Sequence, residues 1–129
     1  MRKPRLKVFF DGGCRPNPGG VIEVAVVVRG IAHVFENLGD GTNSDAEWLA
    51  LIKALEIAQT LGEPSFELIG DAASIIDQAN GIGKCRGAAS QAHLARFMQL
   101  ASGVAPVRIR WVRRAQNLAG IVLAARHER

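Results

Sequence analysis

The sequence predicts an α/β fold in which a mixed five-stranded sheet is flanked by helices. The N-terminal third contains alternating and β-branched apolar runs, which are typical of strands. The remainder alternates between helical periodicity and short apolar runs. Of the 129 residues, 48% are hydrophobic and 22% are charged, a composition that suits a folded domain and excludes a disordered chain. We expect one domain over residues 1–129, with the element order β-β-β-α-β-α-α-β-α.

The first three strands are expected to form an antiparallel meander. Apolar side chains alternate over residues 6–10 and predict a strand that ends at Asp11. Residues 12–20 are rich in glycine and proline and predict a turn. The β-branched segment 21–28 predicts the second strand, and an Arg-Gly turn leads into a third strand near residues 31–37.

The rest of the chain predicts two more strands and four helices. Apolar residues at helical spacing predict a first helix that begins at a cap formed by Asn43 or Ser44 and ends near Gly62. The later elements are expected to be a strand at 66–69, helices at 71–80 and 88–101, a strand at 107–112 and a helix from Asn117 to the end. Because helices connect these last two strands to the sheet, we expect them to pair in parallel.

Cysteine usage and hydropathy favour a protein of the reducing cytoplasm. Cys14 and Cys85 lack the spacing of metal ligands and are expected to be free thiols. No apolar run approaches the ~20 residues that span a bilayer. Lys7 interrupts the apolar segment near the start, so the sequence predicts no signal peptide.

The net charge of +4 is distributed unevenly along the chain. Residues 78–129 contain nine basic side chains and one acidic one, Glu128, whereas residues 1–77 contain eleven acidic and seven basic ones. A half-chain this basic attracts a polyanion such as nucleic acid. A solvated arginine-rich surface explains the same composition equally well.

Three carboxylates are expected to converge at one edge of the sheet. Asp11 and Asp71 each follow a strand of a parallel pair, and Glu47 lies in the first turn of the helix between them. Taken singly, they also fit a turn residue, the second half of a capping box with Ser44, and a helix N-cap. Taken together they suit Mg²⁺ or Mn²⁺, and two such ions about 3.5–4 Å apart promote phosphodiester cleavage.

Four segments carry a resemblance to a known family. Residues 11–20 open with Asp-Gly-Gly, residues 42–47 read Thr-Asn-Ser-Asp-Ala-Glu, and residues 70–76 place an Asp between a strand and a helix. Together with residues 111–117, these segments resemble type 1 ribonuclease H in its compact forms, which lack the basic, tryptophan-bearing handle. The usual Ser after the strand-ending Asp is Ala72 in this chain. The likeness spans nearly the whole chain, and its specificity comes from the order and spacing of the motifs.

The resemblance implies a ribonuclease H-like fold and an enzyme that cuts the RNA strand of RNA–DNA hybrids with two divalent metals. It implies that Asp11 bridges both metals and that Glu47 and Asp71 help hold the ion on the leaving-group side. It also implies contacts to the hybrid backbone and its 2′-hydroxyls, the groups that distinguish RNA from DNA. The residues matching these contacts are Asn17, Thr42 and Asn43.

One position departs from the family's pattern. A fourth carboxylate is expected four residues after Asn117, where this chain has Ile121. Two Mg²⁺ ions carry four positive charges and three carboxylates supply three negative ones, so the ion that carries the attacking water should bind weakly. We therefore expect weakened or absent activity that Mn²⁺ supports better than Mg²⁺. Only Glu128, the terminal carboxylate at Arg129 or a partner chain remain as replacements, and Glu128 is about 10 Å along a helix from Ile121.

Two alternatives to a nuclease remain. The first is a binding module that keeps the fold and the basic surface without cutting. The second is an unrelated small α/β domain with coincidental motifs, which would gain support if the three carboxylates lay more than about 8 Å apart. The family's flexible-loop histidine is absent from residues 113–116, and the three histidines of the chain are expected to be structural, namely His33, His93 and His127.

Overall fold

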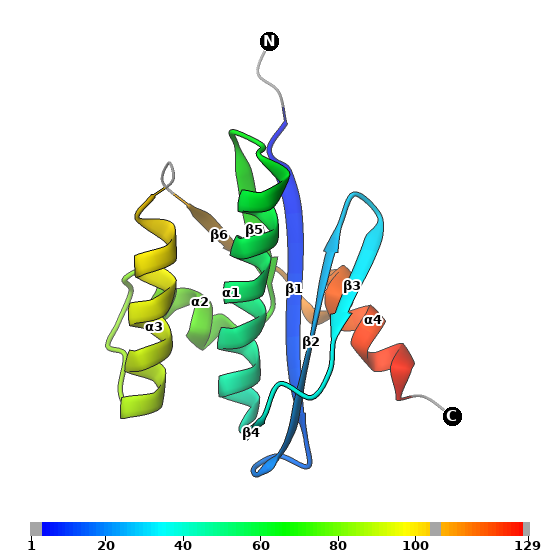
Figure 1. Cartoon of the computed structure of the whole chain (residues 1–129), viewed down its shortest axis with the longest axis vertical. Helices are drawn as coiled ribbons and strands as arrows, with labels where there is room; N and C mark the ends of the chain where they lie inside the picture. Colours follow the sequence, from blue (N-terminus) through cyan, green and yellow to red (C-terminus); the bar gives the residue numbers. More distant parts are fainter. Residues whose placement is uncertain (1–3, 104–106, 128–129) are drawn as a thin grey trace.

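The computed structural model describes residues 4–103 and 107–127 and is built around one mixed sheet (Figure 1). Within these residues the sheet has the strand order β3-β2-β1-β5-β6, and a short β4 pairs with β2. The strands are β1 (Leu6–Arg15), β2 (Gly20–Val28), β3 (Ile31–Phe35), β4 (Asp40–Gly41), β5 (Phe66–Gly70) and β6 (Arg108–Trp111). The helices are α1 (Asn43–Leu61), α2 (Ala73–Ala79), α3 (Ala88–Ala101) and α4 (Leu118–Arg126), preceded by the 3₁₀ turn η1 (Arg114–Gln116).

The predicted pairing of the five main strands is confirmed. β1 pairs with β2 and β2 with β3 in antiparallel fashion, whereas β5 pairs in parallel with both β1 and β6. The chain therefore has the expected α/β architecture, with a meander on one side of β1 and helix-connected strands on the other. The additional β4 is only two residues long and was not predicted, because its Asp-Gly sequence is typical of a turn.

The predicted end of the first strand is wrong. β1 continues beyond Asp11 to Arg15, and Gly12 and Gly13 pair with Val24 and Glu23 of β2. The hydrogen bonds and packing of this long antiparallel pair outweigh the poor strand propensity of glycine. The turn predicted for residues 12–20 is consequently confined to its second half.

The start of α1 also differs from the prediction. Thr42 is the N-cap, in place of Asn43 or Ser44, and its Oγ1 accepts a hydrogen bond of 3.1 Å from the backbone N–H of Asp45. The carboxylate of Asp45 accepts a hydrogen bond of 3.0 Å from the N–H of Thr42, which completes the capping box. Glu47 therefore has no part in capping this helix.

The simple capping interpretation of Asp71 is wrong as well. α2 begins at Ala73, and its N-cap position is Ala72, which makes no side-chain capping bond. By contrast, Asn117 caps α4 as predicted, because its Oδ1 accepts a hydrogen bond of 3.2 Å from the N–H of Ala119. Asp71 follows β5 directly, and its carboxylate does not cap α2.

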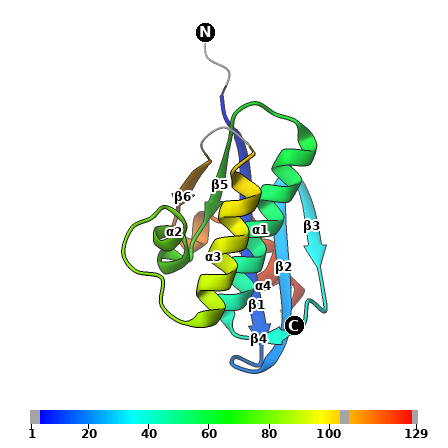
Figure 2. The same cartoon turned by 60° about the vertical axis from the view of Figure 1, so that its left-hand side comes forward.

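The helices cover the sheet unequally (Figures 1 and 2). α1, α2 and α3 pack on one face over the main core, whose largest fully buried side chains include Trp48 and Phe10. α4 packs on the other face, where Ala119 and Leu123 contact β2. Because side chains alternate along β1, Phe10 faces the main core and its neighbour Asp11 faces α4.

Cys14 and Cys85 are free thiols, as predicted. Among the helices of the described residues, none combines the length and hydrophobicity needed to cross a membrane. The cytoplasmic location expected from the sequence stays a prediction.

Candidate metal centre

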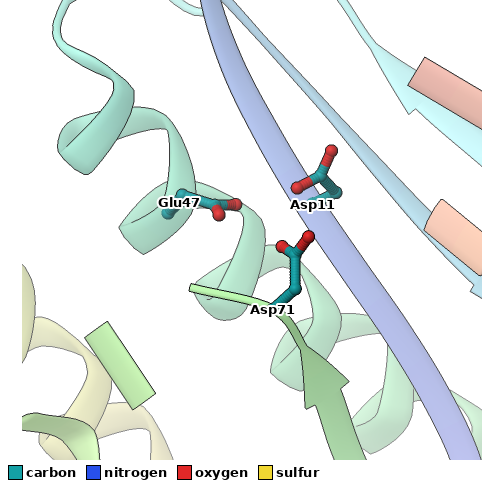
Figure 3. A group of neighbouring side chains, drawn as sticks. All are labelled: Asp11, Glu47 and Asp71. Carbon is teal, nitrogen blue, oxygen red and sulfur yellow. The ribbon is translucent and has the colours of Figure 1, made fainter. Parts of the chain in front are cut away.

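Asp11, Glu47 and Asp71 converge at the edge of the sheet where β5 ends (Figure 3). Each offers one carboxylate oxygen, and these three oxygens lie within 4.8 Å of one another. Asp11 is inside its strand rather than at the strand end, but the parallel register that pairs Phe9 with Ile69 places it beside Asp71 two residues further on. The short distances between the three carboxylates argue against the alternative of an unrelated α/β domain.

Glu47 is positioned by the close approach of α1 to β1. A Cβ atom on Gly12 would lie 2.1 Å from the backbone oxygen of Ala46, so this contact requires glycine. The N–H of Gly12 donates a hydrogen bond of 2.7 Å to Oε1 of Glu47. Gly12 thus holds the Glu47 carboxylate of α1 beside Asp11.

The first turn of α4 covers the opposite side of Asp11. The buried Asn117 donates a hydrogen bond of 3.0 Å from Nδ2 to the carbonyl oxygen of Phe10, which ties α4 to β1 next to the acid. A Cβ atom on Gly120 would lie 3.6 Å from Oδ2 of Asp11. Ile121 is the next residue of this turn, and it is 51% exposed. The turn that faces Asp11 therefore contributes no carboxylate.

Asp71 is held by two contacts from the C-terminal part of the chain. Its backbone oxygen accepts a hydrogen bond of 3.2 Å from Nε1 of Trp111. Nε of Arg114 lies 3.5 Å from Oδ2 of Asp71, although the Arg114 side chain is largely exposed. An exposed ion pair of this kind compensates only part of the negative charge of the cluster.

The pKa values of Asp11 and Glu47 are raised, as expected for crowded carboxylates removed from water. Burial, followed by the charge of Asp71, raises the pKa of Asp11 from 3.8 to about 6. Burial, followed by the charge of Asp11, raises the pKa of Glu47 from 4.5 to about 9. Hard oxygen donors at this spacing fit a divalent cation such as Mg²⁺ or Mn²⁺, whose charge would favour the ionised forms.

We expect the free energy of unfolding of the metal-free protein to fall as the pH rises from about 4 to about 9. Folding raises both pKa values, so the resulting stabilisation is complete below the unfolded-state values and is lost as the pH rises through the folded-state values. Mn²⁺ should consequently raise Tm more at about pH 8 than at about pH 5. Thermal melts at both pH values, with Mn²⁺ and with a chelator, measure this difference; equal shifts would contradict it.

Two of the three predicted substrate-contacting residues meet at the start of α1. Oδ1 of Asn17, in the turn between β1 and β2, accepts a hydrogen bond of 2.9 Å from the backbone N–H of Asn43. Oδ1 of Asn43 accepts one of 3.0 Å from the N–H of Cys14. Thr42 is adjacent as the N-cap, and all three predicted residues are exposed. Asn43 also lines a cavity of about 300 Å³ that it shares with Asp11.

The uneven charge of the sequence is partly balanced in space. Arg108 and Arg110 pair with the buried Glu67 at 3.5 and 3.1 Å, and Arg126 pairs with acids of the N-terminal half. Several arginines of the basic half are therefore structural partners. Of its remaining described cations, four are exposed and make no ion pair within residues 4–103 and 107–127, namely Lys84, Arg86, Arg96 and Arg113.

Sequence reasoning missed Glu23, which lines the same cavity as Asp11 and Glu47. Its side chain is only 14% exposed. The available signal was a single carboxylate in the otherwise apolar segment 21–28, on the strand face where Ala25 and Val27 are buried. A charge on such a face requires a partner. His127, which was expected to be structural, provides one by pairing with Glu23.

The strand order, the helical layers and the acidic edge define this protein as an α/β domain with the ribonuclease H fold. A model of the family described as "Reverse transcriptase-like" matches residues 10–127. Ribonuclease HI of Halobacterium salinarum is 33% identical over 127 residues, which cover 95% of this chain and 64% of that protein. Our chain therefore spans just under two thirds of the length of this curated relative.

Two solved structures superpose on this chain over almost its full length and almost the full length of their own chains. RNase H1 from Halobacterium salinarum NRC-1 superposes with a TM-score of 0.83 at 30% identity, covering 93% of this chain and 94% of that one. The N-terminal RNase H domain of Rv2228c from Mycobacterium tuberculosis gives a TM-score of 0.80 at 26% identity, with coverage of 95% and 96%. The chain belongs to the type 1 ribonuclease H family.

Proposed function

We propose that this protein hydrolyses the RNA strand of RNA–DNA hybrids with the help of two divalent metal ions. The observation that carries the proposal is the convergence of three carboxylate oxygens, from Asp11, Glu47 and Asp71, within 4.8 Å. Hard cations in two-metal sites clamp the attacking and leaving oxygens of a phosphodiester. Similarity to proteins named ribonuclease HI and RNase H1 supports the choice of this reaction.

Each acid has a defined task in this proposal. Asp11 would hold both ions, and Glu47 and Asp71 would help hold the ion on the leaving-group side. When bound, the ions supply an activated water and neutralise charge on the phosphate. The N–H of Gly12 keeps Glu47 in place, and Asn117 keeps the adjacent backbone of β1 in place, so the ligands are positioned before substrate arrives.

Substrate selection is proposed to lie at the start of α1. The oxygens of Asn17 and Asn43 accept hydrogen bonds from the backbone, which orients both side chains and leaves their amide nitrogens as donors. These donors and the hydroxyl of Thr42 suit contacts to phosphate and to the 2′-hydroxyl, which DNA lacks.

We further infer that Ile121 weakens binding of the ion that carries the attacking water. On their own, the three acids leave one positive charge of two divalent ions uncompensated until another anionic ligand or the substrate phosphate arrives. Activity should accordingly be low and better supported by Mn²⁺ than by Mg²⁺. Glu128 and the terminal carboxylate at Arg129, considered above as replacements, lie outside the described residues.

The proposal is tested with one labelled sequence prepared as an RNA–DNA hybrid, a DNA duplex and an RNA duplex. We expect cleavage of the RNA strand of the hybrid only, faster in Mn²⁺ than in Mg²⁺. Asp77→Asn, which changes an exposed acid on α2, is a matched control and should cut like the wild type. Hybrid binding without cleavage in either metal would instead support the silent binding module.

A further inference from the structure

Glu23 lies on β2 close enough for its long side chain to reach Asp11 of the metal centre. It lies on β2 opposite Gly13, while Asp11 is paired with Ala25, two residues further along β2. Glu23 and Asp11 are therefore diagonal neighbours on the face of the sheet that α4 covers. Such neighbours are about 7–8 Å apart between Cα atoms, within reach of long side chains.

The two residues also share a cavity. Asp11, Glu23 and Glu47 all line the same space of about 300 Å³. α4 contributes Gly120, Leu123 and Ala124 to its wall, and the small residues Gly120 and Ala124 occupy little of the space. The side chain of Glu23 therefore has room to turn toward Asp11 without displacing the helix.

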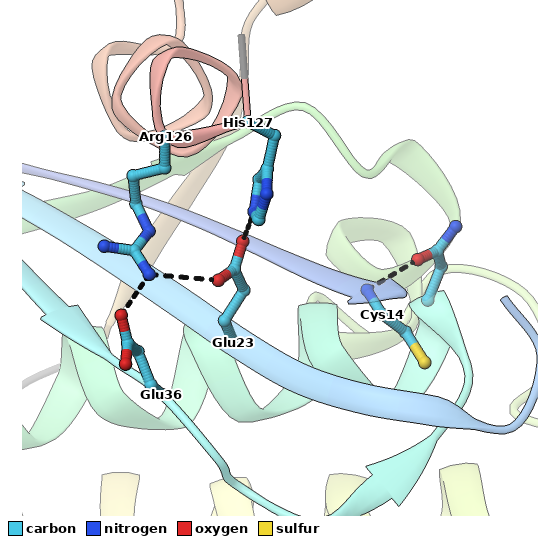
Figure 4. Close-up of polar contacts among 6 residues, drawn as sticks. Cys14, Glu23, Glu36, Arg126 and His127 are labelled. Atoms are coloured by element: carbon cyan, nitrogen blue, oxygen red, sulfur yellow. Dashed lines mark hydrogen bonds and ion pairs between the residues drawn. The ribbon is translucent and has the colours of Figure 1, made fainter. Parts of the chain in front are cut away.

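Two side chains at the C-terminal end of α4, Arg126 and His127, contact the Glu23 carboxylate (Figure 4). Nε2 of His127 contacts Oε1 of Glu23, and Nη2 of Arg126 lies 3.4 Å from Oε2. Arg126 also pairs with Glu36 of the neighbouring segment. His127 lines this cavity, whereas Arg126 does not, and both side chains are about one third exposed.

We propose that Glu23 supplies the fourth carboxylate of the metal centre, in place of the acid that Ile121 cannot provide. This inference rests on the two-metal function proposed above. The carboxylate leaves Arg126 and His127 and binds the ion on the α4 side of Asp11. Four carboxylates then balance the four positive charges of two divalent ions. Carboxylate oxygens are the ligands that Mg²⁺ and Mn²⁺ prefer.

The test is a Mn²⁺ titration of the full chain, without nucleic acid, followed by electron paramagnetic resonance and calorimetry. Glu23→Gln keeps the shape of the side chain and removes its charge. We expect it to weaken the second, weaker Mn²⁺ site by about tenfold or more. Glu36→Gln is the matched control, because Glu36 shares Arg126 with Glu23 but does not line the cavity, and it should bind Mn²⁺ like the wild type. Unchanged binding in Glu23→Gln overturns the proposal.

A second control separates metal binding from anchoring of α4. His127→Gln breaks the same contact but leaves the Glu23 carboxylate in place, so it should retain Mn²⁺ affinity. If His127→Gln and Glu23→Gln weaken Mn²⁺ binding equally, Glu23 is only an anchor and the proposal is wrong. If Glu23→Gln fails to fold, the shorter Glu23→Asp takes its place and should weaken the second site in the same direction.

Asp11→Asn distinguishes failure of this inference from failure of the proposed function. We expect Asp11→Asn to bind Mn²⁺ far more weakly than the wild type. Wild-type Mn²⁺ binding by Asp11→Asn would contradict the two-metal function itself. Loss of binding in Asp11→Asn with wild-type binding in Glu23→Gln would contradict the role of Glu23 alone.

Discussion

Asp11→Asn should reduce cleavage of the RNA–DNA hybrid by at least about 100-fold in both Mg²⁺ and Mn²⁺. Asp11 is the acid proposed to bridge the two ions, and an amide oxygen is a weaker, uncharged ligand. The measurement is initial cleavage rate at saturating metal, with Asp77→Asn as the control that alters an exposed acid elsewhere. A rate within tenfold of the wild type would rule out the bridging role.

The same variant should fold more stably than the wild type when metal is removed. Burial and the neighbouring acids make the charge of Asp11 unfavourable in the folded state. Removing that charge should raise the free energy of unfolding by about 3 kcal/mol at about pH 8 and change it little near pH 4. Denaturant melts at both pH values measure the difference. A variant that is inactive but more stable cannot owe its inactivity to misfolding.

Ile121→Asp should increase Mn²⁺ and Mg²⁺ affinity and raise the cleavage rate by about tenfold or more. A negative charge added near two divalent ions contributes at least ~1.4 kcal/mol of favourable interaction at short range, which is a factor of ten. The fold should tolerate the change, because Ile121 is 51% exposed and lies in the first turn of α4, where acidic residues are favourable. Metal titration and hybrid cleavage measure the gain.

Ile121→Asn is the matched control for this gain, since it has nearly the same shape as Asp without the charge, and it should leave the rate unchanged. A folded Ile121→Asp protein with wild-type metal affinity and rate would mean that the missing carboxylate does not limit metal binding or cleavage.

The double variant that combines Ile121→Asp with Glu23→Gln tests whether the two acids serve the same ion, as proposed. The gain from Ile121→Asp should be larger in the Glu23→Gln background than in the wild type.

Much of the fold could be predicted because local sequence patterns identify most of its helices and strands. The alternation in the first strand, the β-branched run of residues 21–28 and the helical spacing before Gly62 each identify an element without knowledge of its neighbours. The predicted end of the first strand failed because it depends on a partner outside the local segment. β1 runs through Gly12 because β2 lies beside it, and glycine-rich sequence alone favours a turn.

The candidate site also contains residues that the sequence could predict and one that it could not. Asp11, Glu47 and Asp71 could be proposed from their spacing along the chain and from the family resemblance, and their convergence confirms the geometry of that proposal. Glu23 could not, because its relevance depends on the pairing of β1 with β2 and on where the end of α4 docks.

By itself, the sequence determined the α/β class, the order of the elements and the three acids, since periodicity, turn chemistry and motif spacing are properties of short segments. Only the tertiary structure decided which side chains share a cavity, how far Asp11 lies from its strand end, and which basic residues of the C-terminal half are neutralised by acids. These are set by strand register and helix docking, which depend on contacts between residues far apart in the chain.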